Sequence, residues 1–273
     1  MMTMAGIWTN DYGSVMTLEV SGRQVIGTYR SSTGSTGEYL IAGCVSGKAA
    51  TRVESQAVAL AIGWRNLGDE KKDPSWNWAS GLSGQLTVTD EGDVLTLSHL
   101  LVATSDFPEL ARPGTYIDKL VYKRAEQQTP TRTRADIDPV PTGNTLTGRW
   151  VTADGASLML SVHSDSMKRF GIVQGCFRSQ ETSAEVIGFT DINAQESKLS
   201  LQSVSLTIAL SGTDTVCTAC GTLDLATGTL SLLVLTSSVV APAHTYLATQ
   251  ISTQHFSRTP MFSPAIAHLI RLL

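Results

Sequence analysis

Charged residues are scarce in this chain of 273 residues, at 16% of the total, and the net charge is only −4. Proteins that bind nucleic acid carry clustered Lys and Arg, so this balance argues against a nucleic-acid partner. No apolar run approaches the roughly 20 residues of a membrane-spanning helix, so we expect no membrane partner. The N-terminus shows no basic segment followed by an apolar one, which favours a cytoplasmic location.

Cysteine is also rare, with four residues in the whole chain, too few for a disulfide-held scaffold of this length. Cys217 and Cys220 have the spacing of half a zinc site, but no second ligand pair lies nearby in the sequence. On a strand their thiols would point to opposite faces. We therefore predict free thiols, no metal and no cofactor.

What the sequence does contain is short runs of alternating apolar and polar residues, with no convincing helix up to residue 124. This alternation is typical of half-buried strands, and the short connections between runs indicate an antiparallel barrel or sandwich. The runs are 16–20, 25–31, 39–45, 58–64, 82–88, 95–101 and 116–120.

The composition then changes and the pattern starts again. Residues 125–144 are rich in Pro and Thr, which predicts a semi-extended linker, and Gly148 to Ala156 repeats the spacing of Gly6 to Ser14. We therefore predict a first barrel at 1–124, the linker, a second barrel at 145–258 and a tail at 259–273. Apolar residues at helical spacing in the tail predict a short amphipathic helix there.

Polar residues interrupt the first apolar row at its beginning. Asn10, Tyr12 and Ser14 share parity with Met16 and Leu18, so a continuous strand would place all of them on the inward face. Polar groups on an inward face are costly unless they are hydrogen-bonded. The stretch is thus either an internal network that closes the end of the barrel or the wall of a ligand pocket.

An ordered set of short motifs resembles the avidin and streptavidin family. The motifs are Gly-Ile-Trp-Thr-Asn-Asp-Tyr-Gly-Ser at 6–14, Gly-Thr-Tyr-Arg-Ser at 27–31, Gly-Trp-Arg-Asn at 63–66, Ser-Gly-Gln at 83–85 and a late Asp118. The resemblance covers about 5–123 and repeats weakly over 146–258. It implies an all-β chain of two antiparallel up-and-down eight-stranded β-barrels of the calycin type, the first of which would hold biotin or another compound with a cyclic urea or amide.

The resemblance also implies roles for particular residues. Asn10, Ser14 and Tyr29 would donate hydrogen bonds to a ureido oxygen, while Asp118 and Ser31 would face the ureido nitrogens. Such donors suit a carbonyl oxygen, and a carboxylate suits an N–H group. The full predicted ligand-binding set is Asn10, Tyr12, Ser14, Tyr29, Ser31, Trp64, Trp78, Ser80, Leu82, His99, Leu101 and Asp118.

Three aromatic residues of the family are replaced in this sequence. Leu82 and His99 stand at two positions of pocket tryptophans, and Leu110 stands where a neighbouring subunit lends a third. Each lost ring could remove about 1–3 kcal/mol of contact, so we expect affinity for biotin far below that typical of the family. Trp76 and Trp78, just before Ser80, are candidates to close the pocket instead.

Two other functions are compatible with the same residues. Asp118, Tyr29 and His99 would suit an acid–base enzyme such as a cyclase or isomerase, because a neighbouring carboxylate can hold the tautomer of a histidine. His99 is equally compatible with an ordinary barrel-lining histidine bonded to Asp118 or water. A third alternative is a structural protein with two filled barrels.

The second copy has lost the polar residues of the first. Thr152, Ala156, Phe177 and Leu210 stand where Asn10, Ser14, Tyr29 and Trp64 stood, so this barrel would be a scaffold or a partner-packing domain. A tandem copy would also replace one subunit contact of a homo-oligomer.

Overall fold

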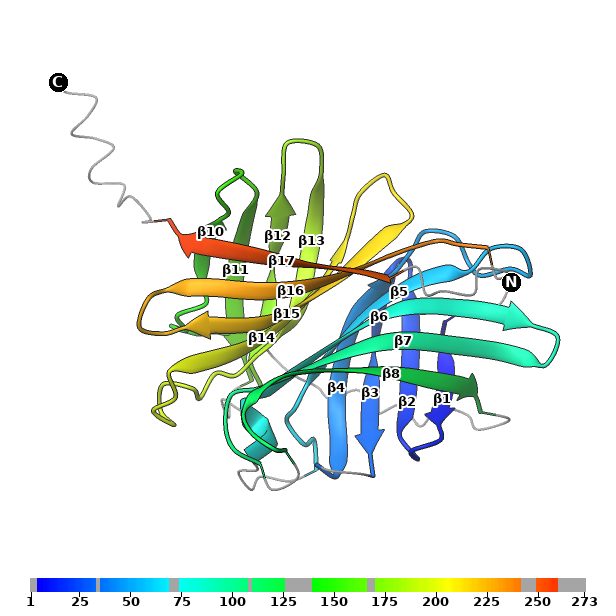
Figure 1. The fold of residues 1–273 in the computed structure, drawn as a ribbon, viewed down its shortest axis with the longest axis horizontal. Helices are drawn as coiled ribbons and strands as arrows, with labels where there is room; N and C mark the ends of the chain where they lie inside the picture. The colour runs from blue at the N-terminus through cyan, green and yellow to red at the C-terminus, as the bar shows by residue number, and fades with distance from the viewer. Residues whose placement is uncertain are drawn as a thin grey trace.

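The computed structural model describes residues 4–32, 35–68, 74–107, 110–125, 139–165, 170–241 and 249–259, and in these it is almost entirely β-structure, as predicted (Figure 1). Eight antiparallel strands close the first barrel in sequence order, because β1 pairs with both β2 and β8. The strands are β1 (Gly6–Asn10), β2 (Val15–Ser21), β3 (Gln24–Ser31), β4 (Gly37–Val45), β5 (Gln56–Gly63), β6 (Trp78–Thr89), β7 (Gly92–Ala103) and β8 (Gly114–Arg124), with a short 3₁₀ helix η1 (Pro74–Asn77) before β6.

The second barrel repeats this order and also closes, since β10 pairs with both β11 and β17. Its strands are β10 (Gly148–Val151), β11 (Ser157–Ser164), β12 (Ile172–Arg178), β13 (Ser183–Thr190), β14 (Leu201–Ala209), β15 (Thr215–Asp224), β16 (Thr229–Ser238) and β17 (Thr249–Arg258). The chain is therefore a tandem of two eight-stranded up-and-down barrels.

Both barrels are closed at the start of their first strand by the same contacts. The indole of Trp8 donates to the carbonyl of Met4, and the guanidinium of Arg124 lies 4.3 Å from the Trp8 ring. In the second copy, Trp150 donates to Leu146 and Arg258 lies 5.9 Å from the Trp150 ring. An indole has one N–H, and satisfying it inside the barrel allows the large apolar ring to be buried without an unpaired donor.

The opening polar stretch is not one continuous strand, which corrects the sequence prediction. Strand β1 ends at Asn10, and a tight turn precedes β2. The Asn10 side-chain oxygen accepts from the backbone N–H groups of Tyr12 (3.1 Å) and Ser14 (2.9 Å), and Gly13 adopts φ of 79°. An Asn side chain that bonds the backbone two residues later, followed by a left-handed Gly, favours a turn over an extended strand.

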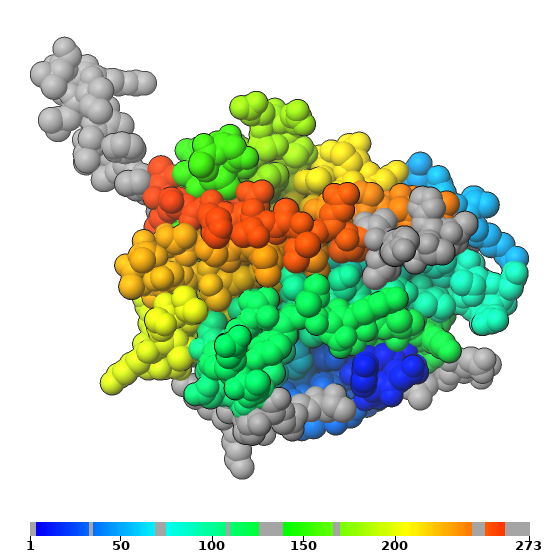
Figure 2. All heavy atoms as spheres, viewed as in Figure 1, coloured from blue at the N-terminus to red at the C-terminus, as the bar shows by residue number. Residues whose placement is uncertain are grey.

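The two barrels pack against each other through β4–β6 of the first and β13–β16 of the second. Strand β5 is buried on both sides: Val58, Leu60 and Ile62 face the first barrel's core, whereas Ala57 and Ala59 face the second barrel. In Figure 2 the orange strands of the second barrel lie directly against the teal strands of the first. Small outward side chains allow this close approach of two sheets.

Part of the predicted linker forms structure. Val140 and Pro141 make a two-residue strand, β9 (Val140–Pro141), on the edge beside β11. A proline is tolerated there because an edge strand needs no donor on its outer side. The rest of the linker at 126–138, and the predicted tail helix from residue 260 onward, lie outside the described residues. No helix in the described ranges has the length and apolar character needed to cross a membrane.

Candidate functional site

A cavity of about 380 Å³ opens at the end of the first barrel where β1–β2, β3–β4, β5–β6 and β7–β8 are connected. Ten of the twelve predicted site residues line it, and the fold brings them together from five strands, β1, β3, β6, β7 and β8, and from the β1–β2 and β5–β6 connections. They are Asn10, Tyr12, Ser14, Tyr29, Ser31, Trp64, Trp78, His99, Leu101 and Asp118. The remaining lining residues are Ser35, Phe107, Leu110 and Leu120.

Hydrogen-bond donors gather on the β1, β3 and β8 side of the cavity. The Tyr29 hydroxyl donates to the Ser14 hydroxyl at 3.1 Å. The side-chain oxygen of Asn10 accepts the hydrogen bonds of the turn. The side-chain amide nitrogen of Asn10 is buried and has no hydrogen-bond partner in the protein. The Tyr122 hydroxyl, on the residue that pairs with Asn10 across β1 and β8, is also buried without a partner, but Tyr122 belongs to the barrel core and does not line the cavity.

Burial, together with the nearby Tyr29, raises the pKa of Tyr122 well above its ordinary value, so its hydroxyl stays protonated. A buried donor without an acceptor costs free energy, typically about 1–3 kcal/mol. On the cavity wall itself, the Asn10 amide nitrogen is therefore a donor that an acceptor atom would satisfy.

A series of aromatic rings in contact with one another forms a second wall, which adjoins Tyr29 through Trp64. Trp64 lies 4.8 Å from Tyr39 and 5.4 Å from Trp78 between ring centroids, and Trp78 lies 4.6 Å from Phe107. The Trp78 indole N–H is buried and has no partner. Trp76, the other candidate to close the pocket, is not among the lining residues and instead stacks against Arg65. Trp78 and Phe107 thus provide the apolar surface at the mouth.

Ser80 and Leu82 differ from their predicted roles, because neither lines the cavity. The Ser80 hydroxyl is fully buried and accepts from the Trp64 indole at 2.8 Å, so it lies beyond the ring and fixes its orientation. Leu82 is also fully buried and belongs to the barrel core. Strand parity identified the inward face correctly but gave no information on depth along the barrel.

His99 is bonded to Ser80 and not to Asp118. Its Nε2 lies 2.9 Å from the Ser80 hydroxyl, and burial lowers the pKa of His99 to about 4 despite the opposing effect of Asp118. The imidazole is therefore neutral at pH 7. Asp118 is exposed at the mouth of the cavity and accepts from the backbone N–H of Lys119 at 2.7 Å.

The depressed pKa of His99 predicts a loss of stability in mild acid. Between the unfolded value of 6.5 and the folded value of about 4, the unfolded chain binds a proton that the folded barrel does not, so unfolding is favoured as the pH falls through this window. Compared with His99→Gln, the wild type should lose about 1–2 kcal/mol more free energy of unfolding between pH 7 and pH 4.5. Denaturant titrations at both pH values measure this difference, and equal losses in the two proteins would contradict it.

Sequence reasoning left four lining residues out of the predicted set: Ser35, Phe107, Leu110 and Leu120. Ser35 lies in the β3–β4 connection, is 4% exposed, and bonds to the hydroxyls of Tyr39 (2.7 Å) and Ser75 (2.9 Å). Phe107 lies in the β7–β8 connection and packs on Trp78. The sequences of both connections lack the apolar–polar alternation from which inward residues were identified. The sequence indicated only that connections at the Asn10 end of the barrel must surround its mouth.

The corresponding residues of the second barrel make a different interior. Thr152 repeats the turn of Asn10, with its backbone N–H bonded to Ala156 and Gly155 at φ of 91°, but Ala156 brings no hydroxyl. Phe177 and Leu210 pack against the apolar core. Cys217 faces this core while Cys220 faces the first barrel, and within the described ranges no group of three or more His, Cys, Asp or Glu is arranged to hold a metal ion.

Comparison with known proteins gives a family match for the first barrel. The model of the avidin family matches residues 1–117. The crystal structure of a rhizavidin–biotin complex is similar, with 20% identity and a TM-score of 0.37 over 47% of this chain and 100% of that one. The crystal structure of xenavidin is also similar, with 17% identity and a TM-score of 0.35 over 45% of this chain and 97% of that one. No curated protein matches the chain.

Proposed function

We propose that the first barrel, which the model of the avidin family matches over residues 1–117, binds a small molecule containing a cyclic urea or amide, with biotin as the first compound to test. The observation that carries the proposal is the Asn10 amide nitrogen, a buried donor that lines the cavity without a protein partner, next to the lining Ser14–Tyr29 hydroxyl pair. A urea or amide carbonyl oxygen accepts two or more hydrogen bonds and would satisfy donors on this side of the cavity.

The other walls of the cavity suit the remainder of such a ligand. The Asp118 carboxylate lies at the mouth, where it can accept a hydrogen bond from a ring N–H of the ligand. A hydrogen bond from an N–H group to a carboxylate is stronger than one between two neutral groups. The rings of Trp64, Trp78 and Phe107 offer apolar surface for the ring atoms. Small-molecule sites commonly combine such apolar walls with a few fixed polar groups.

The enzyme alternative is less well supported. An acid–base role for His99 requires a pKa near the working pH, whereas burial lowers the pKa of His99 to about 4 and its Nε2 is occupied by Ser80. Asp118 is exposed, and Tyr29 donates its proton to Ser14. Binding without chemical conversion therefore agrees better with the arrangement.

Titration calorimetry with biotin tests the proposal, and Asn10→Asp is the informative variant. Aspartate keeps an oxygen for the turn but replaces the free N–H₂ group with an acceptor, so we expect binding to weaken by about 10–100-fold. Asn144→Asp is the matched control, because Asn144 also accepts a backbone N–H (2.9 Å, from Leu146) but lies between β9 and β10 and does not line this cavity. Its affinity should equal that of the wild type.

The control ligand is 2-imidazolidinone, the simplest cyclic urea. Binding of both compounds supports recognition of the urea group, and biotin binding that Asn10→Asp leaves unchanged would overturn the assigned role of the amide. Absence of heat with either compound at millimolar concentration would overturn the proposal.

A further inference from the structure

The connection between β5 and β6 begins with Trp64 and leads into Trp78, and both side chains line the cavity. The second barrel contacts this connection through a buried hydrogen bond. Asn77, the residue before Trp78, donates its side-chain N–H to the Asp191 carboxylate at 2.6 Å. Both residues are buried, at 8% and 2% exposed. The Asn77 carbonyl also accepts from Thr104 at 2.8 Å, which ties the connection to the end of β7.

Arg65, the residue after Trp64, also lies in the β5–β6 connection, and its charge is compensated by acidic residues of the second barrel. Its guanidinium lies 3.4 Å from the centroid of the Trp76 ring and is buried, at 6% exposed. Burial lowers the pKa of Arg65 to about 10, and Asp191, Asp165 and Glu196, all from the second barrel, counter this shift. A buried cation needs compensating charges, and here the other barrel provides them.

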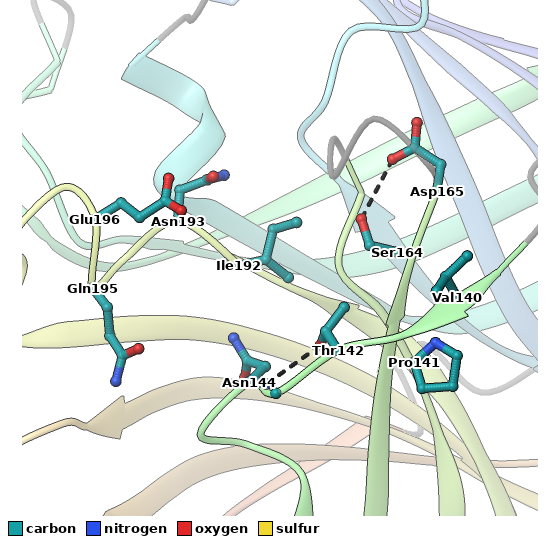
Figure 3. Close-up of a pocket in the computed structure, with 11 residues that line it drawn as sticks. Val140, Pro141, Thr142, Asn144, Ser164, Asp165, Ile192, Asn193, Gln195 and Glu196 are labelled. Carbon is teal, nitrogen blue, oxygen red and sulfur yellow. Dashed lines mark hydrogen bonds between the residues drawn. The ribbon is translucent and has the colours of Figure 1, made fainter.

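The three acidic residues lie at one end of the second barrel. Asp165 and Glu196 line a cavity of about 500 Å³ there, and Figure 3 shows the η1 turn of the first barrel beside the segment of Asn193 and Glu196. Asp191 follows β13 directly, and its second oxygen accepts from the backbone N–H of Asn193 at 2.8 Å. A carboxylate with bonds on both oxygens is fixed in position.

We propose that Asp191 is a positioning residue for the cavity of the first barrel: it holds the connection that orients Trp64 and Trp78, so the second barrel acts as a fixed support for a site it does not contain. This inference rests on the proposed function, because it treats that cavity as the ligand site. The second barrel lacks the polar side chains of a ligand site, and the proposal assigns it a supporting role for the first barrel instead.

The test compares Asp191→Ala and Asn77→Ala with a control at another part of the junction between the barrels. Ser237→Ala removes a buried hydroxyl pair between the barrels, Ser83 to Ser237 at 2.8 Å, which lies farther along β6 and outside the connection itself. Amide hydrogen exchange in peptides covering 74–82 reports on the connection without ligand. We expect exchange at least about tenfold faster in both variants and unchanged in the control, a factor that corresponds to about 1.4 kcal/mol.

Affinity for biotin, measured by calorimetry, gives the second readout. Both variants should bind about tenfold more weakly, and Ser237→Ala should bind as the wild type. Asp191→Asn keeps one acceptor oxygen in place of two, so its exchange protection should lie between that of Asp191→Ala and that of the wild type. If Asp191→Ala does not fold, Asn77→Ala and Asp191→Asn decide the question. Exchange equal to that of the wild type, or an equal effect of Ser237→Ala, would overturn the inference. If the wild type binds no biotin, the biotin version of the proposed function is wrong. Hydrogen exchange in the variants still tests whether Asp191 holds the β5–β6 connection.

Discussion

Replacing Trp64 with alanine is expected to lower the free energy of unfolding by about 3–5 kcal/mol, the range for removing a large buried aromatic side chain. Trp64 is 7% exposed and contacts the rings of Tyr29, Tyr39 and Trp78. Its indole N–H also donates to the buried Ser80 hydroxyl at 2.8 Å. The substitution removes these contacts together and leaves a void beside the ligand cavity.

Guanidinium denaturation followed by far-UV circular dichroism measures this loss, and Trp64→Phe separates its two parts. Phenylalanine keeps most of the ring contacts but has no N–H, so Trp64→Phe should lower the free energy of unfolding clearly less than Trp64→Ala. Trp76→Phe is the matched control, because that ring is outside the cavity. A loss below about 1 kcal/mol for Trp64→Ala would show that the aromatic wall does not hold the barrel together.

The fold of the chain could be predicted because strand alternation and the repeated motif are local signals. The positions of Asn10, Tyr29 and Asp118 at one cavity followed from the resemblance and agree with strand parity. The turn at Gly13 was missed, because the same polar residues fit an extended strand and a turn, and the bonds from Asn10 to the backbone decide between them.

The contacts between the barrels could not be predicted for a different reason. Asn77 and Asp191 are separated by 114 positions in the chain, and nothing in the sequence around either residue indicates the other. Ser80 is similar: its parity is correct, but its distance from the mouth depends on the tilt of the strands and on the orientation of Trp64. Parity identifies a face of a strand, whereas depth and pairing depend on the closed three-dimensional arrangement.

The second large effect is expected at Gly81 of β6, which faces Thr218 of the second barrel. A methyl group at this position would lie 2.2 Å from Cγ2 of Thr218, far inside van der Waals contact. Thr218 has little freedom to move, because its hydroxyl points to the carbonyl oxygens of Leu60 (3.2 Å) and Leu82 (3.0 Å). Gly81→Ala should therefore destabilise the chain by about 3 kcal/mol, at the upper end of the usual cost of overpacking.

A second substitution should reverse most of this loss. Thr218→Ser removes the methyl group that meets the new side chain but keeps the hydroxyl for Leu60 and Leu82, so Gly81→Ala with Thr218→Ser should be more stable than Gly81→Ala alone. Denaturation of the four proteins in this cycle gives the coupling energy, which we expect to reach about 1.5 kcal/mol or more. Additive effects of the two substitutions would mean that the barrels are not in tight contact at this point in solution. Coupling of that size would show instead that the second barrel is a packed part of the wall behind Ser80 and Leu82, because Thr218 meets the first barrel at Gly81 and Leu82 of β6 and at Leu60 of β5.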